Sequence, residues 1–151
     1  MSTNWVQDMA EMHQKYGVNE WFEQNKDDNV LMSKYLQFRM LMINEELHET
    51  LQAVNMGNQE EIVDGLIDLC VFAIGTLDVF GVDANKAWDE IYAANMNKKV
   101  GVKPGRPNPF GLPDLLKPAG WQGPNHEGNH GELAVAEQKI RDRTPIDRSG
   151  W

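Results

Sequence analysis

Acidic side chains crowd two neighbouring segments of the chain, and carboxylates in such numbers can bind metal ions. The acids of the first segment and then of the second are Glu45, Glu46, Glu49, Glu60, Glu61, Asp64 and Asp68. Asp64 and Asp68 interrupt residues 62–72, a run that is otherwise apolar apart from Gly65. A carboxylate is costly where a helix has almost no polar face, unless a cation meets it. The pattern therefore predicts a cation beside these two aspartates.

The spacing of the acids predicts which of them can meet. A short polar turn around Gly57 makes the helices before and after it antiparallel neighbours. Glu49 lies eight residues before Gly57, and Asp64 lies seven after it. Glu46 and Asp68 each lie eleven residues away. Because spacings of three and four residues keep the acids of each helix on one face, four carboxylates are predicted at one level of a bundle.

Such a cluster cannot ionise fully at neutral pH without positive charge beside it. Oxygen-only ligands suit Mg²⁺, with Mn²⁺ as the other candidate. Glu61 lies nearer the turn and is a second-rank ligand by its height. Whether Glu61 or Asp68 completes the metal site stays open here. Asp68 is favoured because it lies inside the apolar run.

A different metal site is indicated by Glu45 and His48, which have the Glu-x-x-His spacing of di-iron carboxylate bundles. That site needs a second helical copy of the pattern. The other copy, Glu127 with His130, lies in a segment rich in glycine and proline that is not expected to be helical. The di-iron interpretation is therefore the weaker one.

Four helices are predicted to position the acids. The one that carries the glutamates has apolar residues at helical spacing, from Leu36 to Val54, and Gly57 is expected to end it. Asn58 is expected to cap the helix that carries the aspartates. This helix should be the central, buried one because it is apolar almost all round from Leu69 to Leu77. Ser2 or Thr3 is the expected cap of the first helix. The predicted helices span residues 4–16, 29–56, 59–80 and 84–99, with a connecting loop over 18–29.

The composition changes after residue 100. Residues 101–129 hold six of the seven prolines, and no convincing strand is visible anywhere in the chain. We expect an all-α, four-helix bundle-like domain over residues 1–100 and an extended arm over 101–151. The apolar residues of the arm, among them Phe110 and Trp121, are expected to anchor it on the helical body or on another subunit. A short helix is expected within 131–143.

Charge and cysteine content limit the classes of function. The net charge is −9, which argues against a nucleic-acid polymer as partner, since phosphate contacts need a basic surface. Cys70 is the only cysteine and is expected to be a buried, inert thiol, which fits a reducing cytosol. No signal peptide is visible, and the longest apolar stretch is about half a membrane span. A cytoplasmic protein with no membrane partner is expected.

The acidic segments resemble a known family. Glu45-Glu46-Leu47-His48-Glu49 is similar to the Glu-Glu-x-x-Glu signature of MazG-like nucleoside triphosphate pyrophosphohydrolases, an all-α superfamily. The family's following Glu-x-x-Asp element has two placements here: Glu61 with Asp64, or Asp64 with Asp68, where Asp64 stands one position early. Asn95-Met96-Asn97-Lys98 resembles an Asn-x-x-Lys element that contacts substrate. The resemblance covers about residues 4–103.

This resemblance implies Mg²⁺-dependent hydrolysis of (deoxy)nucleoside triphosphates to the monophosphate and pyrophosphate. It implies that the acids hold the metal and that Lys98 and Asn95 bind the nucleotide. Glu45 could be the general base if it reaches the metal-bound water, although it points away from the acidic face. The metal ligands that the resemblance implies are Glu46, Glu49, Asp64 and Asp68, with Glu61 as the alternative member.

The resemblance also implies a homodimer or homotetramer, and the arm is similar to the tails of phage-encoded members. A non-catalytic helical module that binds metal or nucleotide is the alternative from another class of function. Trp21 or Phe38 is an expected stacking partner for the base, with nothing in the sequence to choose between them.

Overall fold

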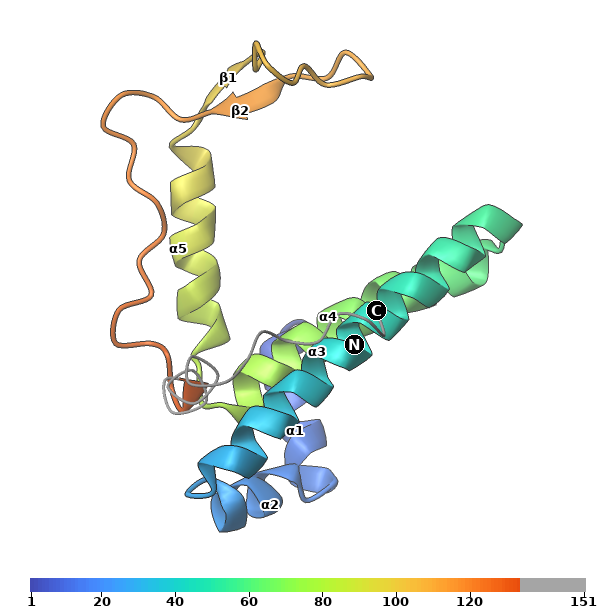
Figure 1. Cartoon of the computed structure of the whole chain (residues 1–151), viewed down its shortest axis with the longest axis vertical. Helices are drawn as coiled ribbons and strands as arrows, with labels where there is room; N and C mark the ends of the chain where they lie inside the picture. Colours follow the sequence, from blue (N-terminus) through green and yellow to red (C-terminus); the bar gives the residue numbers. More distant parts are fainter. Residues whose placement is uncertain (134–151) are drawn as a thin grey trace. The chain divides into compact units, whose positions relative to one another are not determined.

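The computed structural model describes residues 1–133 and is all-α apart from one small hairpin of strands (Figure 1). This confirms the predicted fold class. In the described part of the chain the elements are α1 (Trp5–Lys15), α2 (Val18–Asn25), α3 (Asn29–Met56), α4 (Gln59–Val79), α5 (Ala84–Met96), β1 (Lys99–Gly101) and β2 (Asp114–Leu116).

The chain forms two compact units, which are described separately. Of the described residues, the first unit holds Met1–Ala84 and residues 130–133, and the second holds Asn85–Asn129. The domain boundary expected after residue 100 stays a prediction, because compactness alone does not show where a catalytic domain ends.

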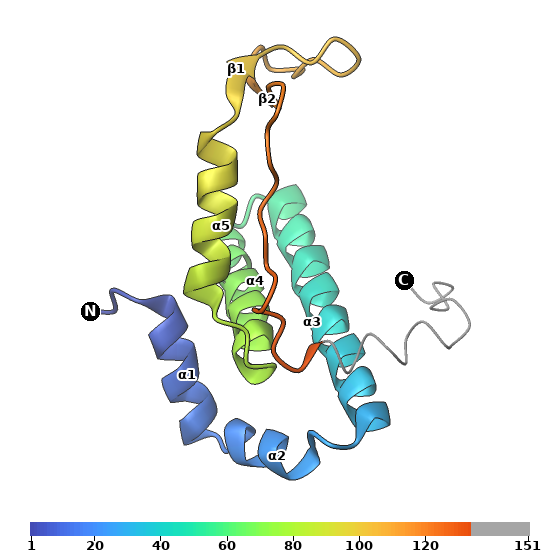
Figure 2. The ribbon, with the colours of Figure 1, turned by 90° about the vertical axis from the view of Figure 1, so that its left-hand side faces the viewer.

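The first unit is built on the antiparallel pair α3 and α4, against which α1 and α2 pack (Figure 2). Its core lies where α2, the start of α3 and the end of α4 meet. Phe80 and Met32 are fully buried there, with Phe22 and Val79 beside them. The rings of Phe22 and Phe80 meet edge to face, with centroids 5.7 Å apart, a favoured arrangement for aromatic pairs.

The prediction of a connecting loop over residues 18–29 was wrong, because α2 occupies most of that segment. Val18, Trp21 and Phe22 stand at positions i, i+3 and i+4, which form one apolar side of a two-turn helix. Phe22 is buried, and Trp21 lies against Tyr35 with ring centroids 4.8 Å apart. Tertiary packing thus stabilises a helix too short to hold by itself.

A buried polar network at the interface of α1 and α4 was missed from the sequence. His13 is buried, and its Nδ1 lies 2.6 Å from Asp78 Oδ2. Nearby on α3, Arg39 donates from Nε to Thr76 Oγ1 (3.0 Å) and from an Nη to the carbonyl oxygen of Phe72 (3.1 Å). Burial lowers the pKa of Arg39. The sequence signal that His13 points inward was its spacing of four residues from Met9, which places both on one side of α1.

The helix ends follow the expected capping with one correction. Gly57 ends α3 in the left-handed conformation (φ 67°), and the Asn58 side chain caps α4, both as predicted. The cap of α1 is Asn4 rather than Ser2 or Thr3: its side chain accepts from the Gln7 backbone N–H at 3.3 Å. The helix begins one residue later than expected for that reason.

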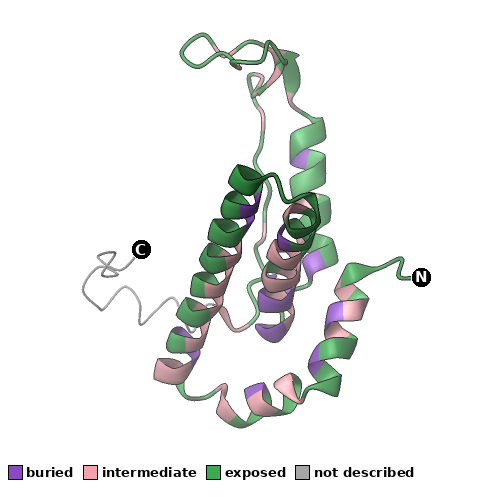
Figure 3. Ribbon diagram, turned by 90° about the vertical axis from the view of Figure 1, so that its right-hand side faces the viewer, coloured by how far each residue is buried: buried purple, intermediate pink, exposed green. Residues whose placement is uncertain are grey.

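α4 was expected to be the central, buried helix because Leu69–Leu77 is apolar almost all round, but it is only partly buried: Ala73, within that run, is exposed. Its buried residues are Gly65, Gly75, Thr76 and Val79, whereas Val63 is 63% and Leu66 is 53% exposed. Figure 3 shows exposed residues over both helices of the hairpin near their turn. An apolar face remains open because α1 and α2 cover only the other end of α4.

The second unit corrects two expectations. Residues 101–129 were expected to lack regular structure, yet β1 and β2 pair antiparallel, with Val100 opposite Leu115. The hairpin escaped notice because each strand has only three residues, too few for an alternating pattern. The helix expected over 84–99 ends at Met96 because β1 follows it.

Trp121, one of the arm's expected anchors, is held by a hydrogen bond to α5. The Trp121 indole donates to the carbonyl oxygen of Ala94 at 2.7 Å, whereas Phe110 is 85% exposed. The short helix expected within 131–143 falls almost entirely outside the described residues. Among the described residues, no single helix is long and apolar enough to cross a membrane, although α4 and α5 counted together pass that test of length and composition.

Candidate active site

The acids predicted to converge lie on the facing helices α3 and α4. Glu46 and Glu49 belong to α3, and Asp64 and Asp68 belong to α4. The turn between the helices is tight: the Asn58 N–H donates to the Ala53 carbonyl at 2.9 Å, so the two chains leave it side by side. The hairpin therefore has the antiparallel form that is needed for acids at equal distances from the turn to lie beside one another.

The two helices approach closely at the level of the acids. A Cβ atom on Gly65 would overlap Thr50 Oγ1, so glycine is the residue that fits there. Thr50 is buried, and its hydroxyl donates to the carbonyl oxygen of Glu46 at 2.6 Å. Gly65 follows Asp64, and Thr50 follows Glu49. This contact thus brings together the backbones that carry the acids.

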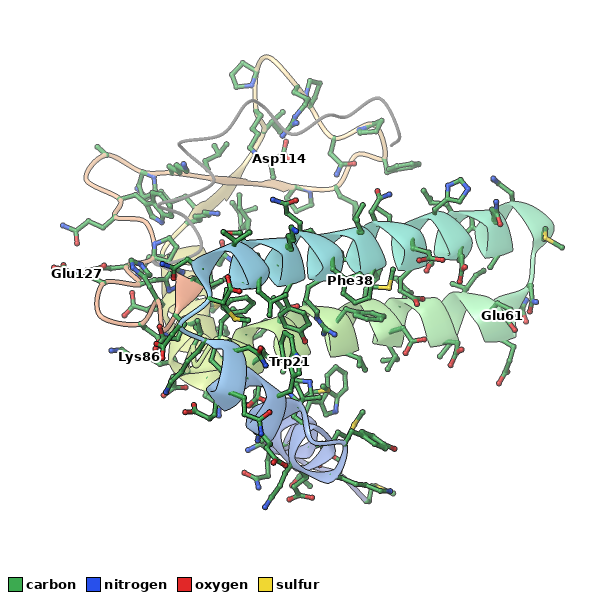
Figure 4. The ribbon with its side chains drawn as sticks, turned by 60° about the horizontal axis from the view of Figure 1, so that its bottom comes forward. Trp21, Phe38, Glu61, Lys86, Asp114 and Glu127 are labelled. Carbon is green, nitrogen blue, oxygen red and sulfur yellow. The ribbon has the colours of Figure 1, made fainter. Side chains whose placement is uncertain are left out.

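The electrostatics of Glu46 show which acids are neighbours. Its pKa is raised, first because partial burial removes water and then because four carboxylates repel its negative charge. The four, in order of decreasing effect, are Asp68, Glu49, Glu45 and Asp64. Glu61 is not among them, and Figure 4 shows it at the turn end of the hairpin, apart from Phe38. Asp68, rather than Glu61, therefore stands with the other acids.

The cluster has the charge and the donor atoms for a divalent cation, but its carboxylates are not arranged in a coordination geometry. The ion pairs found among residues 1–133 are His13 with Asp78 and Lys26 with Glu23, so neither neutralises the cluster. As the side chains stand, the described residues include no group of three or more His, Cys, Asp or Glu placed to hold a metal. Carboxylate oxygens suit Mg²⁺ by their chemistry, and the side chains must turn toward one another to bind it.

Two residues beside the cluster have other surroundings. Glu45 is exposed and follows the helix to a different side, so it faces solvent. His48 Nε2 lies 3.0 Å from Gln52 Nε2 on the same helix. Glu127 and His130, the second Glu-x-x-His copy, lie in turns outside any helix, so the structure provides no second helical pair for a di-iron site in the described residues.

The Asn-x-x-Lys element lies in the second unit, at the end of α5. Lys98 Nζ donates to Asn95 Oδ1 at 2.7 Å, so the two residues form one polar group. The Lys98 ammonium also lies 5.3 Å from the centroid of the Trp121 ring. Sequence reasoning found the pair through the resemblance and missed Trp121 as its neighbour.

The remaining candidates lie apart from the acids. Trp21 packs on Tyr35 as part of the core, whereas Phe38 is 50% exposed on α3. Cys70 is half-buried rather than fully buried. It lines an apolar cavity of about 200 Å³ between α1 and α4, where Asp8 is the only charged residue. The cavity contains none of the predicted site residues.

Comparison with known proteins agrees with the resemblance seen in the acids. Residues 18–95 match the family described as phosphoribosyl-ATP pyrophosphohydrolase. The match covers α2, α3, α4 and nearly all of α5, including the acidic hairpin and Asn95. No curated protein matches the chain.

Proposed function

The chain belongs to the phosphoribosyl-ATP pyrophosphohydrolase family, within the MazG-like all-α nucleoside triphosphate pyrophosphatase superfamily, and from that premise we propose a more specific activity. The domain is a pyrophosphohydrolase domain, acting on phosphoric anhydrides. We propose that it hydrolyses (deoxy)nucleoside triphosphates to the monophosphate and pyrophosphate, with Mg²⁺ as cofactor.

One observation carries the proposal: carboxylates on two facing helices repel one another, and no cationic side chain of the described residues pairs with them. A divalent cation would reverse this repulsion. A cation held there can in turn bind a triphosphate, which an acidic surface alone would repel. The arrangement therefore suits a metal–nucleotide complex better than either the metal-free nucleotide or a basic ligand.

Each residue has a defined role in this mechanism. Glu46, Glu49, Asp64 and Asp68 would hold Mg²⁺, and a bound divalent cation would supply positive charge for the phosphates and would make a water molecule more acidic. Glu45 faces solvent beside this cluster, where it can accept a proton from an attacking water. Asn95 would donate a hydrogen bond to the nucleotide, and Lys98 would neutralise phosphate charge.

A second candidate substrate is phosphoribosyl-ATP, which the description of the family names. It carries the same triphosphate group as a nucleoside triphosphate, so the acids and the metal would play the same parts. The two substrates differ in the additional phosphoribosyl group of phosphoribosyl-ATP.

The deciding experiment offers the purified protein a panel of ribo- and deoxynucleoside triphosphates and phosphoribosyl-ATP, with Mg²⁺, and identifies the products. Release of pyrophosphate and a monophosphate from at least one nucleoside triphosphate is expected. Release of orthophosphate, or turnover of phosphoribosyl-ATP alone, would contradict the proposed activity. Stabilisation by nucleotide and Mg²⁺ with no product would instead identify a binding module, and iron in the purified protein would revive the di-iron alternative.

Substitutions test the assignment of the acids. Asp68→Asn should lower kcat/KM by about 100-fold or more, since a metal supplies several kcal/mol of transition-state stabilisation and each 1.4 kcal/mol is a factor of ten. Glu60→Gln removes the same charge from the exposed first turn of α4 and should change kcat/KM less than about threefold. Glu61→Gln decides the open alternative: a loss as large as that of Asp68→Asn would place Glu61 in the cage.

A further inference from the structure

Positive charge is concentrated in the part of the chain that follows α5. Residues 97–126 contain one acid, Asp114, although the whole chain has a net charge of −9. The cationic residues of this segment are Lys98, Lys99, Lys103, Arg106 and Lys117. A local excess of cations in an acidic protein indicates an anionic ligand rather than general solubility.

Two of these lysines flank the strand pair at the same end. In the register of β1 and β2, Lys99 is opposite Leu116. Lys98 comes directly before β1, and Lys117 comes directly after β2. The pairing of the strands therefore brings Lys98 and Lys117 to one end of the small sheet.

Both ammonium groups lie near the ring of Trp121. Lys98 Nζ lies 5.3 Å and Lys117 Nζ lies 4.7 Å from the centroid of its ring, distances at which a cation is attracted to an indole. The ring is itself fixed, because its Nε1–H donates to the Ala94 carbonyl at 2.7 Å. The lysines and the ring thus form a built group at the end of α5.

No carboxylate of the described residues forms an ion pair with these lysines. The ion pairs found there are His13 with Asp78 and Lys26 with Glu23. Lys98 donates to a neutral amide, that of Asn95, at 2.7 Å. Two cations beside one aromatic ring, neither of them paired with a carboxylate, have the charge to bind a doubly or multiply charged anion.

We propose that Lys98, Lys117 and Trp121 form a phosphate-binding site, and that the arm thereby supplies a substrate-binding residue, Lys117, for the polyphosphate of the nucleotide. The naming of a nucleotide rests on the proposed function. Lys117 and Lys98 bind phosphate oxygens as point charges. Trp121 is a positioning residue, since it acts through the two ammonium groups that its ring holds.

The test follows the Trp121 indole N–H by NMR in the full chain, with Trp121→Phe identifying its resonance. Inorganic tripolyphosphate without metal should shift this resonance in a saturable way, and a nucleoside triphosphate should do the same. Lys117→Gln should weaken binding about tenfold, and Lys117→Arg should restore it to within about threefold. Lys99→Gln, the same loss of charge at the neighbouring position, should leave binding within about twofold.

Four outcomes would overturn the inference. They are no shift in the wild-type protein, equal weakening by Lys99→Gln and Lys117→Gln, no rescue by Lys117→Arg, and tighter binding of a single-stranded oligonucleotide than of the triphosphate. If Lys117→Gln already moves the resonance without ligand, Lys98→Gln takes its place, with the same tenfold weakening expected and unaltered binding contradicting the site.

Activity separates this inference from the proposed function. In an active protein, Lys117→Gln should raise KM about tenfold and leave kcat within about twofold, whereas a general loosening of the fold would lower kcat as well. Turnover without binding at Trp121 would remove the phosphate site and leave the proposed function standing. Binding at Trp121 without any turnover would remove the proposed activity and leave the site standing.

Discussion

At the scale of single residues, Glu46 reports on the candidate active site. Its raised pKa has two sources, partial burial and the charges of its neighbours, of which Asp68 has the largest effect. Asp68 comes from the other helix, so the effect exists only in the folded chain. Glu46 is thus a probe of both the fold and the charge state of the cluster.

The sign of the resulting pH dependence follows from linkage. Folding raises the pKa of Glu46, so the native state retains this proton at pH values where the unfolded chain has lost it. The contribution of Glu46 to stability is therefore greatest below its unfolded pKa, about 4.3, and falls as the pH rises through the folded value. At neutral pH the ionised Glu46 destabilises the metal-free protein.

Glu46→Gln should consequently raise the melting temperature of the metal-free protein at pH 7 by about 1–2 °C, the size expected of a screened repulsion. The gain should disappear near pH 4, where Glu46 is largely protonated in both states. Thermal unfolding across this pH range measures it, with Glu60→Gln as the control that should show a smaller gain. A melting temperature lowered at pH 7 would show that Glu46 is not repelled by its neighbours.

At the scale of elements, the hairpin of α3 and α4 places the acids through one close contact. Gly65 has no side chain, and this lets Thr50 pack against the backbone of α4. The Thr50 hydroxyl is satisfied by the Glu46 carbonyl of its own helix. The level at which the helices meet is therefore set by a small residue, and the acids on either side of it share that level.

Gly65→Ala should destabilise the protein by about 1–2 kcal/mol. The added Cβ would overlap Thr50 Oγ1 severely, so overpacking should cost roughly 2–3 kcal/mol, of which the better helix propensity of alanine offsets about 1 kcal/mol. The free energy of unfolding in urea measures the change. Thr50→Ala removes the Oγ1 atom that the new Cβ would meet, so the double variant should recover most of the loss.

A matched control is Gly105→Ala, where an added Cβ would have nothing within 4 Å. It should change stability by less than about 0.5 kcal/mol. An equal loss at Gly65 and Gly105, or no recovery in the double variant, would show that the contact with Thr50 is not the cause.

At the scale of the whole molecule, the first unit exposes an apolar stripe along α3. Met40, Leu47, Leu51 and Val54 recur at helical spacing on one side of the helix, and Leu51 and Val54 are each 53% exposed. Apolar residues gathered on one face, rather than scattered singly, mark an interaction surface. The expected assembly of this protein is a homodimer or homotetramer, and we propose that this stripe lies at its interface.

Light scattering after size-exclusion chromatography should therefore give a mass of two or four chains, against 17.2 kDa for one. Leu51→Glu should shift the protein toward the monomer, since a charge in an apolar interface is costly to bury. Lys34→Gln, an exposed residue near the other end of α3, serves as the control and should leave the mass unchanged. A wild-type monomer, or an oligomer indifferent to Leu51→Glu, would contradict the proposed interface.

The sequence by itself determined the helical class, the extent of α3 and α4 to within one residue, and the caps Gly57 and Asn58 between them. It also predicted that the acids stand at matching distances from the turn. These features depend on periodicity and on local backbone chemistry, and both are written in neighbouring residues. Gly57 and Asn58 are the clearest examples, since a left-handed glycine and an asparagine cap act within a few residues of themselves. The resemblance to the family rested on the same local spacing.

Only the tertiary structure decided what depends on contacts between distant residues. The short helix α2 forms because Phe22 packs on Phe80, and His13 is buried because it meets Asp78. The strands β1 and β2 are too short to leave a pattern, yet Lys98 before β1 and Lys117 after β2 both lie near the ring of Trp121. The choice of Asp68 over Glu61 as a neighbour of Glu46 likewise required the packed hairpin, because the repulsion between two carboxylates depends on the distance between them and not on their separation in sequence.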